Sequence, residues 1–280
     1  MYELSGKTAV VTGAGGGIGL ALAKRAYAEG MNVVLADLDE VALKAIAKTF
    51  DDSTRIGVRS VDVSDRESMA EFATYVRELF GSVHLLFNNA GVKGSFGPTW
   101  ALDPAHWART IDVNLLGVIN GLSAFVPNMI ADQVEGYIVN TASFAGLCPI
   151  PGNGPYVATK AAVVAISETL AHELRHAEAR IGVSVLCPSL VATPMTQAPP
   201  EASQAQAPAP EQAAAMARVM ASADTPEVAA DITFDAIESG TFYILTSPQA
   251  DQHISARLEA IAAHTLPPEP PLDAIAGSRN

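Results

Sequence analysis

The sequence predicts an α/β protein built on one doubly wound parallel sheet of about seven strands, with helices on both faces. Short runs rich in β-branched residues alternate with longer amphipathic stretches, which is the order expected of strands joined by helical crossovers. The runs are almost continuously apolar, as strands are when helices cover both faces of their sheet. A glycine-rich turn follows the first run, where a strand must give way quickly to a helix.

Each expected strand is an apolar run flanked by turn-forming residues. The strands are expected at residues 8–12, 32–36, 56–61, 83–88, 136–141, 181–187 and 241–246. A helix is expected over residues 20–29, ended by Gly30, and longer helices around 105–127 and 156–177. Prolines, alanines and glutamines dominate residues 193–224, with a helical stretch expected at 211–221.

Length and composition are those of one globular domain. The chain has 280 residues, of which 49% are hydrophobic and 17% charged, so it can bury a large core. We expect a single domain of the Rossmann type over residues 1–266 and a loosely held, proline-rich tail over residues 267–280.

Charge and targeting signals exclude several classes of protein. Thirty acidic residues against 17 basic ones give a net charge of −13, which repels a phosphate backbone, so no nucleic-acid partner is expected. The N-terminus lacks the basic and apolar regions of a secretion signal, and no apolar run approaches the ~20 residues of a membrane span, so we expect a cytoplasmic protein without a membrane partner. Cys148 and Cys187 are too few for a disulfide framework or a zinc site, and we expect two structural thiols.

The glycine-rich turn is a candidate nucleotide site. The first strand leads into Thr12-Gly-Ala-Gly-Gly-Gly-Ile-Gly19, directly before the first helix. Glycines at 13, 17 and 19 permit a tight turn and a close approach of a pyrophosphate to the N–H groups at the helix N-terminus. The second strand ends at Asp37, whose carboxylate can accept hydrogen bonds from ribose hydroxyls and repels the extra phosphate of NADP. Leu38 and Asp39 supply no compensating arginine, so NAD is favoured as the cofactor.

Tyr156 and Lys160 form a candidate acid–base pair. At a spacing of four they project from one face of a helix, and a fixed ammonium stabilises a phenolate and lowers its pKa. The pattern is common by itself, and it gains meaning from Ser143, which stands 13 residues earlier, and from the nucleotide site.

His172-Glu-Leu-Arg-His176 matches a zinc-protease pattern literally. His172 is 16 residues beyond Tyr156 on the same predicted helix, roughly 24 Å at ~1.5 Å per residue, and no obvious third ligand follows. We therefore interpret the two histidines as a solvated helix surface and expect no metal.

Together these motifs resemble the classical short-chain dehydrogenase/reductase family, from about Lys7 to Thr193 and more loosely to Thr246. The resemblance implies that Tyr156 is the general acid–base, that Ser143 binds the substrate oxygen, that Lys160 binds the nicotinamide ribose, and that Asn114 holds a water of the proton relay. It also implies a set of residues that bind the cofactor: Thr12, Gly13, Gly17, Ile18, Gly19, Asp37, Leu38, Asp62, Val63, Asn89, Ala90, Gly91, Tyr156, Lys160, Pro188, Val191 and Thr193.

Two further features concern the substrate. The family usually has Pro-Gly after the sixth strand, whereas this chain has Pro188-Ser189, so the loop is expected to follow a different path. Residues 114–121, 125–130 and 241–246 resemble the subgroup of Cα-dehydrogenases of lignin-derived aryl ethers, which implies an apolar or aromatic secondary alcohol. Candidate pocket residues, for which ordinary packing is the alternative, are Phe96, Phe144, Leu147, Ile150 and Met195.

The expected activity is NAD-dependent hydride transfer between a secondary alcohol or ketone and nicotinamide. The alternatives are an NADPH-dependent ketone reductase and a dinucleotide sensor without catalysis. Residues 195–224 follow the strand that should face the nicotinamide, so we expect a substrate lid there rather than an idle loop. Long helices suited to packing across two-fold axes, together with the resemblance, predict a homotetramer or homodimer.

Overall fold

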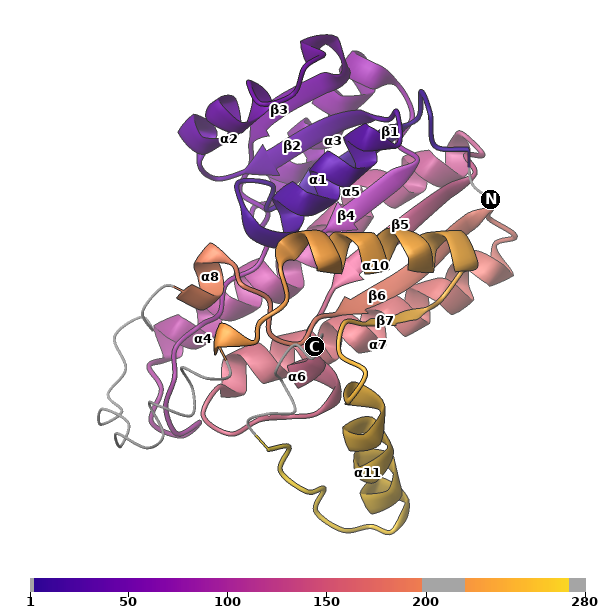
Figure 1. Cartoon of the computed structure of the whole chain (residues 1–280). Helices are drawn as coiled ribbons and strands as arrows, with labels where there is room; N and C mark the ends of the chain where they lie inside the picture. The colour runs from indigo at the N-terminus through magenta and orange to yellow at the C-terminus, as the bar shows by residue number, and fades with distance from the viewer. Residues whose placement is uncertain (1–2, 198–219, 272–280) are drawn as a thin grey trace.

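The computed structural model describes residues 3–197 and 220–271 of the chain. Within these residues seven parallel strands form one sheet in the order β3-β2-β1-β4-β5-β6-β7, drawn in Figure 1. The predicted fold class is confirmed. The strands are β1 Thr8–Thr12, β2 Asn32–Asp37, β3 Ile56–Ser60, β4 Leu85–Asn88, β5 Gly136–Thr141, β6 Ile181–Cys187 and β7 Tyr243–Leu245.

The strand order places a crevice at the centre of the sheet. The chain starts in the middle with β1, builds outward to β3, and then returns to add β4 on the other side of β1. Val10 of β1 therefore pairs with Val34 of β2 on one side and with Leu86 of β4 on the other. The connections after β1 and β4 leave the sheet in opposite directions, which opens a binding crevice at the carboxyl ends of these strands.

Helices connect successive strands and begin at recognisable caps. Asp39, Asp65 and Asp103 each accept a hydrogen bond from a backbone N–H in the first turn of the helix that follows, and Pro104 occupies a first helical position. The helices are α1 Gly17–Ala28, α2 Glu40–Ala47, the 3₁₀ turn η1 Ser53–Arg55, α3 Arg66–Phe80, α4 Pro104–Ile111, the π-helical turn η2 Asp112–Leu116, α5 Gly117–Ala131, α6 Phe144–Leu147, α7 Gly154–His176, α8 Pro194–Gln197, α10 Pro226–Ser239 and α11 Ala250–Ala262.

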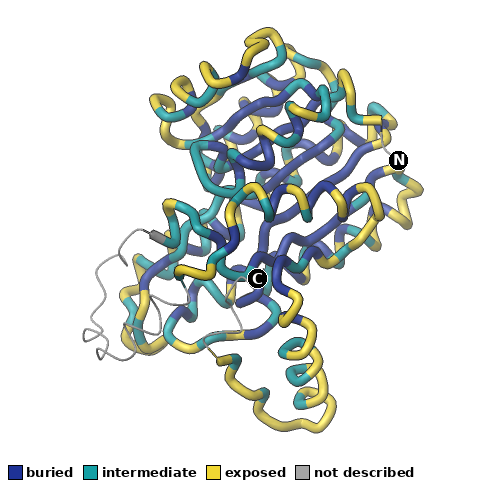
Figure 2. The backbone as a smooth tube through the Cα atoms, in the orientation of Figure 1, coloured by how far each residue is buried: buried dark blue, intermediate teal, exposed yellow. Residues whose placement is uncertain are grey.

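The core consists of two apolar layers, one on each face of the sheet. On one face α1 and α10 bury side chains such as Leu22 and Phe234 against Val11 and Leu35. On the other face α3, α5 and α7 bury side chains against alternate residues of the same strands, for example Phe72 against Val10. Figure 2 shows the strands as the most deeply buried part of the chain. Burial on both faces explains why the strands are largely apolar in sequence.

Some predicted boundaries and elements were wrong. Strand β3 ends one residue earlier than expected, β4 begins at Leu85, and β7 spans only Tyr243–Leu245. Helix α11 was not predicted; Figure 1 shows it projecting from the body of the fold. The helix expected around 105–127 is interrupted by the π-helical turn η2. Most of the helix predicted at 211–221 and residues 272–280 of the predicted tail lie outside the described residues.

One helical stretch is more apolar than expected. Pro104–Ala131 is long and apolar enough to cross a membrane by length and composition, with a mean hydropathy of 1.4 in its most apolar window. The expectation that no apolar run approaches this length is therefore wrong. In the fold, α5 packs Phe125, Val126 and Met129 against the sheet, and 39% of that window is buried. The apolar side chains of α5 thus form part of the hydrophobic core on this face of the sheet.

Candidate active site

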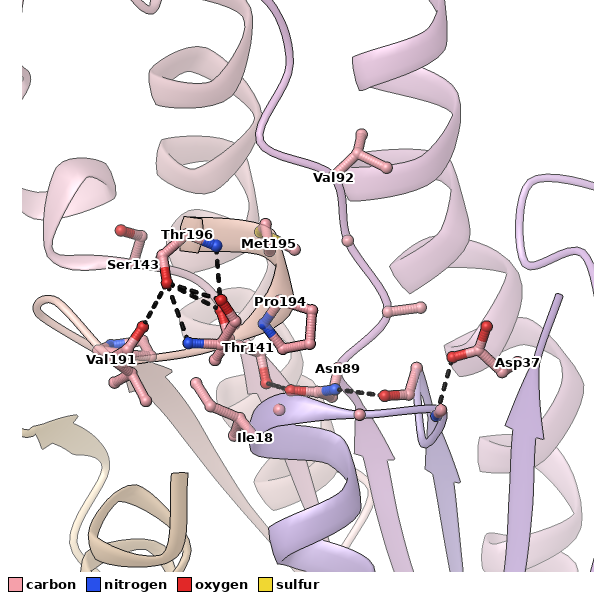
Figure 3. A pocket seen from close by; sticks show the side chains of 18 of the residues that line it. Ile18, Asp37, Asn89, Val92, Thr141, Ser143, Val191, Pro194, Met195 and Thr196 are labelled. Atoms are coloured by element: carbon pink, nitrogen blue, oxygen red, sulfur yellow. Dashed lines mark hydrogen bonds between the residues drawn. The ribbon is translucent and has the colours of Figure 1, made fainter. Parts of the chain in front are cut away.

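A cavity of about 400 Å³ lies at the carboxyl ends of the strands, at the crevice predicted by the strand order. Residues that follow β1, β2, β4, β5 and β6 line it together with α7 and α8, as Figure 3 shows for part of the set. The structure thus brings together many of the residues singled out in the sequence: Gly13, Gly17, Ile18, Asp37, Asn89, Ala90, Gly91, Ser143, Tyr156, Lys160, Pro188, Val191, Thr193 and Met195.

The glycine-rich turn forms one wall of this cavity. Gly13 and Gly17 have φ angles of +69° and +52°, a conformation that favours glycine. A Cβ atom at Gly19 would lie 2.1 Å from the carbonyl oxygen of Gly13, so only glycine lets the turn fold back on the helix. Thr12 and Asn89 hold the turn against β4, because the Thr12 hydroxyl accepts the N–H of Asn89 at 2.9 Å and the Asn89 amide donates to the Thr12 carbonyl at 3.1 Å.

The N-terminus of α1 opens toward the cavity without a side-chain cap. Its N-cap is Gly16, no side chain accepts from the first turn, and no acidic residue stands there. The N–H groups of this turn carry partial positive charge and need an acceptor. The donor set therefore fits a pyrophosphate.

Asp37 lies beside the same turn, at the end of β2. Its Oδ2 atom accepts the backbone N–H of Gly15 at 2.9 Å, the bond drawn from Asp37 to the turn in Figure 3. Its Oδ1 atom accepts the N–H of Asp39 at 3.3 Å. Backbone donors thus hold the carboxylate at the cavity wall, where its remaining lone pairs can accept hydroxyl groups.

The proposed acid–base group, Tyr156, stands in the first turn of α7, lines the same cavity and is hydrogen-bonded to Ser143. The Ser143 hydroxyl caps α6 by accepting the N–H of Ala145 at 3.2 Å, and it donates its own hydrogen to the phenol oxygen of Tyr156. Lys160 lies one helical turn beyond Tyr156, with its ammonium 5.7 Å from the centre of the phenol ring. The ammonium donates to the carbonyl of Thr141 at 2.7 Å, so its position is fixed.

Burial controls the titration of this group of side chains. Desolvation raises the pKa of Tyr156, and this effect outweighs the hydrogen bond from Ser143, which lowers it. Desolvation also lowers the pKa of Lys160 to about 8. The prediction that Lys160 lowers the pKa of the tyrosine is therefore wrong for this structure, because both groups are withdrawn from water.

Cys187, beneath these residues at the end of β6, is buried and has a pKa raised to about 12 by desolvation. It remains a neutral thiol at physiological pH, as expected of a structural cysteine. Cys148 is likewise buried, and burial raises its pKa.

Asn114 lies in the π-helical turn η2 and is completely buried. Its Oδ1 atom accepts the N–H of Val92 at 2.7 Å, and its amide donates to the Val92 carbonyl at 2.9 Å. A Cβ atom at Gly91 would lie 3.2 Å from Asn114 Oδ1 and 3.5 Å from Lys160 Nζ, so the glycine lets both side chains approach. Asn114 thus fixes the segment after β4, and a π-helical turn at such a point is frequent in functional sites.

Comparison with known proteins identifies the family. The model of the short chain dehydrogenase family matches residues 7–204, which include both walls of the cavity. The chain belongs to the short-chain dehydrogenase family.

Three relatives illustrate where this short-chain dehydrogenase lies in the family. The crystal structure of a short-chain dehydrogenase/reductase from Burkholderia phymatum in complex with NAD is 40% identical and has a TM-score of 0.86, with 97% of this chain and 99% of that chain covered. The CLA biosynthesis dehydrogenase/reductase of Lactiplantibacillus plantarum is 30% identical, with 98% of this chain and all of the relative covered. The 1-deoxy-11-beta-hydroxypentalenate dehydrogenase of Streptomyces exfoliatus is 31% identical, with coverages of 96% and 94%.

Several predicted site residues do not line the cavity of this short-chain dehydrogenase. Among those predicted to bind the cofactor, Leu38 is 64% exposed at the surface, and Asp62 caps the following turn by accepting the N–H and the hydroxyl of Ser64. Val63 packs into the core. Thr12 bonds the glycine-rich turn to Asn89, and Gly19 packs against the Gly13 carbonyl, so both contribute to the shape of the turn without lining the cavity.

The predicted substrate residues divide in the same way. Met195 lines the cavity, whereas Phe144 is 1% exposed and packs with Cys148, Ala250 and the ring of His253. Placing Phe144 in the pocket is therefore not supported, because the turn into α6 directs its ring to the core. Leu147 packs beside it, Ile150 is half-buried outside the cavity, and Phe96 is 36% exposed.

Sequence reasoning missed other residues that line the cavity of the dehydrogenase. Gly15 and Gly16 lie within the glycine-rich turn, and Val92 directly follows Gly91, so the sequence carries a local signal for these three residues. The rest are reached only through the fold: Asp39, Ala42, Thr141, Ala142, Ser189, Pro194 and Thr196.

Ser189 replaces the usual family glycine without strain. Among the described residues other than glycine, positive φ angles occur only at Gln133, Glu178 and His264, so the backbone at Ser189 does not require glycine. Its N–H donates to the hydroxyl of Thr246 at 2.9 Å, which anchors the loop to the end of β7. Thr196 then ties the loop to α8 by donating to the Val191 carbonyl at 2.9 Å.

The two histidines of the zinc-protease pattern lie at the far end of α7. His172 and His176 are both exposed, at the end of a helix whose first turn carries Tyr156. Within residues 3–197 and 220–271, no group of three histidine, cysteine or acidic side chains is placed to hold a metal ion.

Proposed function

We propose that this short-chain dehydrogenase transfers hydride between a secondary alcohol or ketone and the nicotinamide of NAD, with Tyr156 as the general acid–base. One observation carries the proposal. Ser143, Tyr156 and Lys160 share a single cavity with the glycine-rich turn and Asp37, so proton-transfer groups face a nucleotide site. Residues 1–266 would then be one NAD-binding catalytic domain.

The residues of the cavity fit NAD. The uncapped turn at Gly16 would hold the pyrophosphate, Asp37 would accept the adenosine ribose hydroxyls, and Lys160 would bind the nicotinamide ribose. Val191 and Thr193, on the loop after β6, would contact the carboxamide. NAD, when bound, supplies the acceptor or donor of a hydride. The complex of the Burkholderia phymatum relative with NAD supports this choice.

The proton chemistry follows from the environment of Tyr156. Because its pKa is raised, the phenol is protonated at neutral pH and can donate its proton to a carbonyl oxygen during ketone reduction. In alcohol oxidation the phenol must first lose that proton, after which the phenolate takes the proton of the alcohol. With substrate bound, the Ser143 hydroxyl would turn its hydrogen from the Tyr156 oxygen to the substrate oxygen and stabilise its developing charge. Asn114 does not line the cavity and its side-chain amide is bonded to Val92, so its proposed part in the proton relay follows from the family resemblance alone.

The lining next to Tyr156 suits an apolar secondary alcohol. Val92, Val191, Pro188 and Met195 present apolar surface, with the serine and tyrosine hydroxyls to orient a single oxygen. The resemblance of residues 114–121 to the Cα-dehydrogenase subgroup supports an aromatic or otherwise apolar substrate. The name of the Streptomyces exfoliatus relative likewise includes a hydroxylated substrate.

Residues 195–224 remain our proposal for a substrate lid. Of this segment, residues 198–219 lie outside the described residues. Backbone hydrogen bonds join the residues on the two sides of this gap. The Ala192 N–H donates to the Asp224 carbonyl at 2.9 Å, and the Asp224 N–H donates to the Leu190 carbonyl at 3.1 Å. Residues 190–192 and Asp224 therefore lie side by side, and Val191 lines the cavity.

We expect the substitution Asp37→Ala to shift cofactor preference toward NADP. Removing the carboxylate removes a charge that repels the 2′-phosphate and an acceptor for the ribose hydroxyls, so kcat/KM for NAD should fall by about tenfold or more while that for NADP rises. Steady-state kinetics with both cofactors measures this. An unchanged ratio would show that Asp37 does not select the cofactor, and the matched control Asp65→Ala removes a helix-capping carboxylate outside the cavity.

We also propose that the chain acts in the cytoplasm as a homo-oligomer, a dimer or a tetramer. An apolar groove between α5 and α7, lined by Val126, Ile130, Ile166 and Leu170, offers a surface for a second copy. We expect Ile130→Glu, a change at a side chain that is 39% exposed, to halve the native mass or reduce it further in sedimentation velocity. A wild-type monomer, or an unchanged mass for the variant, would refute this use of the groove.

A further inference from the structure

The Asp37 carboxylate accepts its shorter backbone hydrogen bond from Gly15 in the glycine-rich turn. The Gly15 N–H donates to Asp37 Oδ2 at 2.9 Å across a separation of 22 residues. A Cβ atom built on Gly15 would lie 2.8 Å from that oxygen and 2.9 Å from the carboxyl carbon. Any side chain at Gly15 would therefore occupy the place that the carboxylate now takes.

We propose that Gly15 is a positioning residue that sets the preference for NAD over NADP by holding the Asp37 carboxylate against the turn. The inference rests on the proposed function and deepens it. Gly15 acts in two ways: its N–H anchors one carboxylate oxygen, and its lack of a side chain makes room for the carboxyl group. The carboxylate then faces the cavity beside the helix N-terminus, where the adenosine ribose would lie.

The neighbouring glycine provides a contrast within the same turn. A Cβ atom at Gly16 would meet only the Cγ of Pro194, at 3.5 Å, which is an ordinary van der Waals contact. Gly16 has extended backbone, with a φ of 172°, so alanine is tolerated there. At Gly15 the backbone is also outside the left-handed region, so alanine should fold and displace only the flexible end of Asp37.

The test measures the dissociation constants of NAD and NADP by titration calorimetry for Gly15→Ala and Gly16→Ala, each made with Asp37 and with Asp37→Ala. We expect Gly15→Ala to weaken NAD by about tenfold, the value of a lost hydrogen bond to a charged group, and to affect NADP much less. In the Asp37→Ala background Gly15→Ala should change the NADP/NAD ratio by less than twofold. Gly16→Ala should affect both cofactors equally in either background.

Four results would contradict these expectations in distinguishable ways. Equal weakening of NAD and NADP by Gly15→Ala, or a shift in their ratio that persists without the Asp37 carboxylate, would overturn the inference alone. Failure of the unmodified chain to bind either nucleotide would overturn the proposed function as well. Thermal melting of the ligand-free Gly15→Ala protein within a few degrees of the wild type is part of the expected result, and a collapsed melting transition would overturn the role of Gly15 as a positioning residue.

Discussion

Replacing Tyr156 with phenylalanine is expected to lower turnover by between about a hundredfold and ten-thousandfold, the usual contribution of a positioned general acid–base. The substitution removes only the phenol oxygen. Packing of the ring in the first turn of α7, and the ammonium of Lys160 5.7 Å from the ring centre, should be unaffected. Binding of NAD should therefore change by less than about threefold, since the lost hydrogen bond is small.

The measurement for Tyr156→Phe is turnover with a panel of secondary alcohols and ketones, together with the dissociation constant of NAD. Tyr243→Phe is a matched control, because Tyr243 is 43% exposed and its hydroxyl donates to Glu168 away from the cavity. The control should keep wild-type turnover. If Tyr156→Phe retained more than a tenth of the turnover, Tyr156 would not be the acid–base group.

Replacing Lys160 with methionine is expected to abolish most activity while stabilising the fold at neutral pH. The ammonium faces the ring of Tyr156 and, in the proposed function, would bind the nicotinamide ribose, so its loss should reduce turnover by about a hundredfold or more. Methionine has a similar length and fills the same buried space, in which Lys160 is 3% exposed. Turnover falls and stability rises because the same buried charge is needed for the reaction and disfavours folding.

The stability of the Lys160→Met protein should also depend on pH. The pKa of Lys160 falls from 10.5 to about 8 in the folded protein, so the charged lysine disfavours folding by roughly 3 kcal/mol. The lost hydrogen bond to the Thr141 carbonyl offsets about half of this, which leaves a net gain on the order of 1–2 kcal/mol at pH 7 for methionine. The unfolded chain holds its proton to higher pH than the folded chain. The wild type therefore recovers stability as the pH rises from about 8 toward 10.5, and the advantage of methionine disappears over that window.

Urea unfolding at pH 7 and pH 9.5 checks this second prediction, with Lys24→Met as a control at an exposed position of α1. A Lys160→Met protein that is less stable than the wild type at pH 7 would show that the ammonium contributes more to the fold than its burial costs. Turnover within tenfold of the wild type would show that the ammonium is not needed for the reaction.

The fold class could be predicted from the sequence because its signals are local. The strands are short runs dominated by apolar and β-branched residues, because most of their positions are buried on both faces, as every position from Thr8 to Thr12 is. The edge strand β3 departs from this at its exposed end, Arg59-Ser60. The glycine-rich turn is also local, since the positive φ angles of Gly13 and Gly17 are properties of single residues. The pairing of Tyr156 with Lys160 follows from helical spacing alone.

Predictions failed where the outcome depended on the direction of a side chain after a change of backbone path. Phe144 follows Ser143 directly, yet Ser143 lines the cavity while Phe144 enters the core, because the short helix α6 begins between them. The pKa of Tyr156 was predicted to be lowered by its neighbour, whereas burial of the whole pair raises it. Desolvation depends on every element that packs around a group, and sequence spacing carries no information about it.

By itself the sequence determined the strands, the glycine-rich turn and the residues that carry chemistry, because these depend on neighbours within one turn of helix or one strand. Only the tertiary structure decided that Asp37 rests on Gly15, that Asn114 holds Val92, and that Ser143 meets Tyr156 across one cavity. Each of these contacts joins residues separated by at least 13 positions, and each exists because the parallel order of the sheet gathers the carboxyl ends of its strands at one edge.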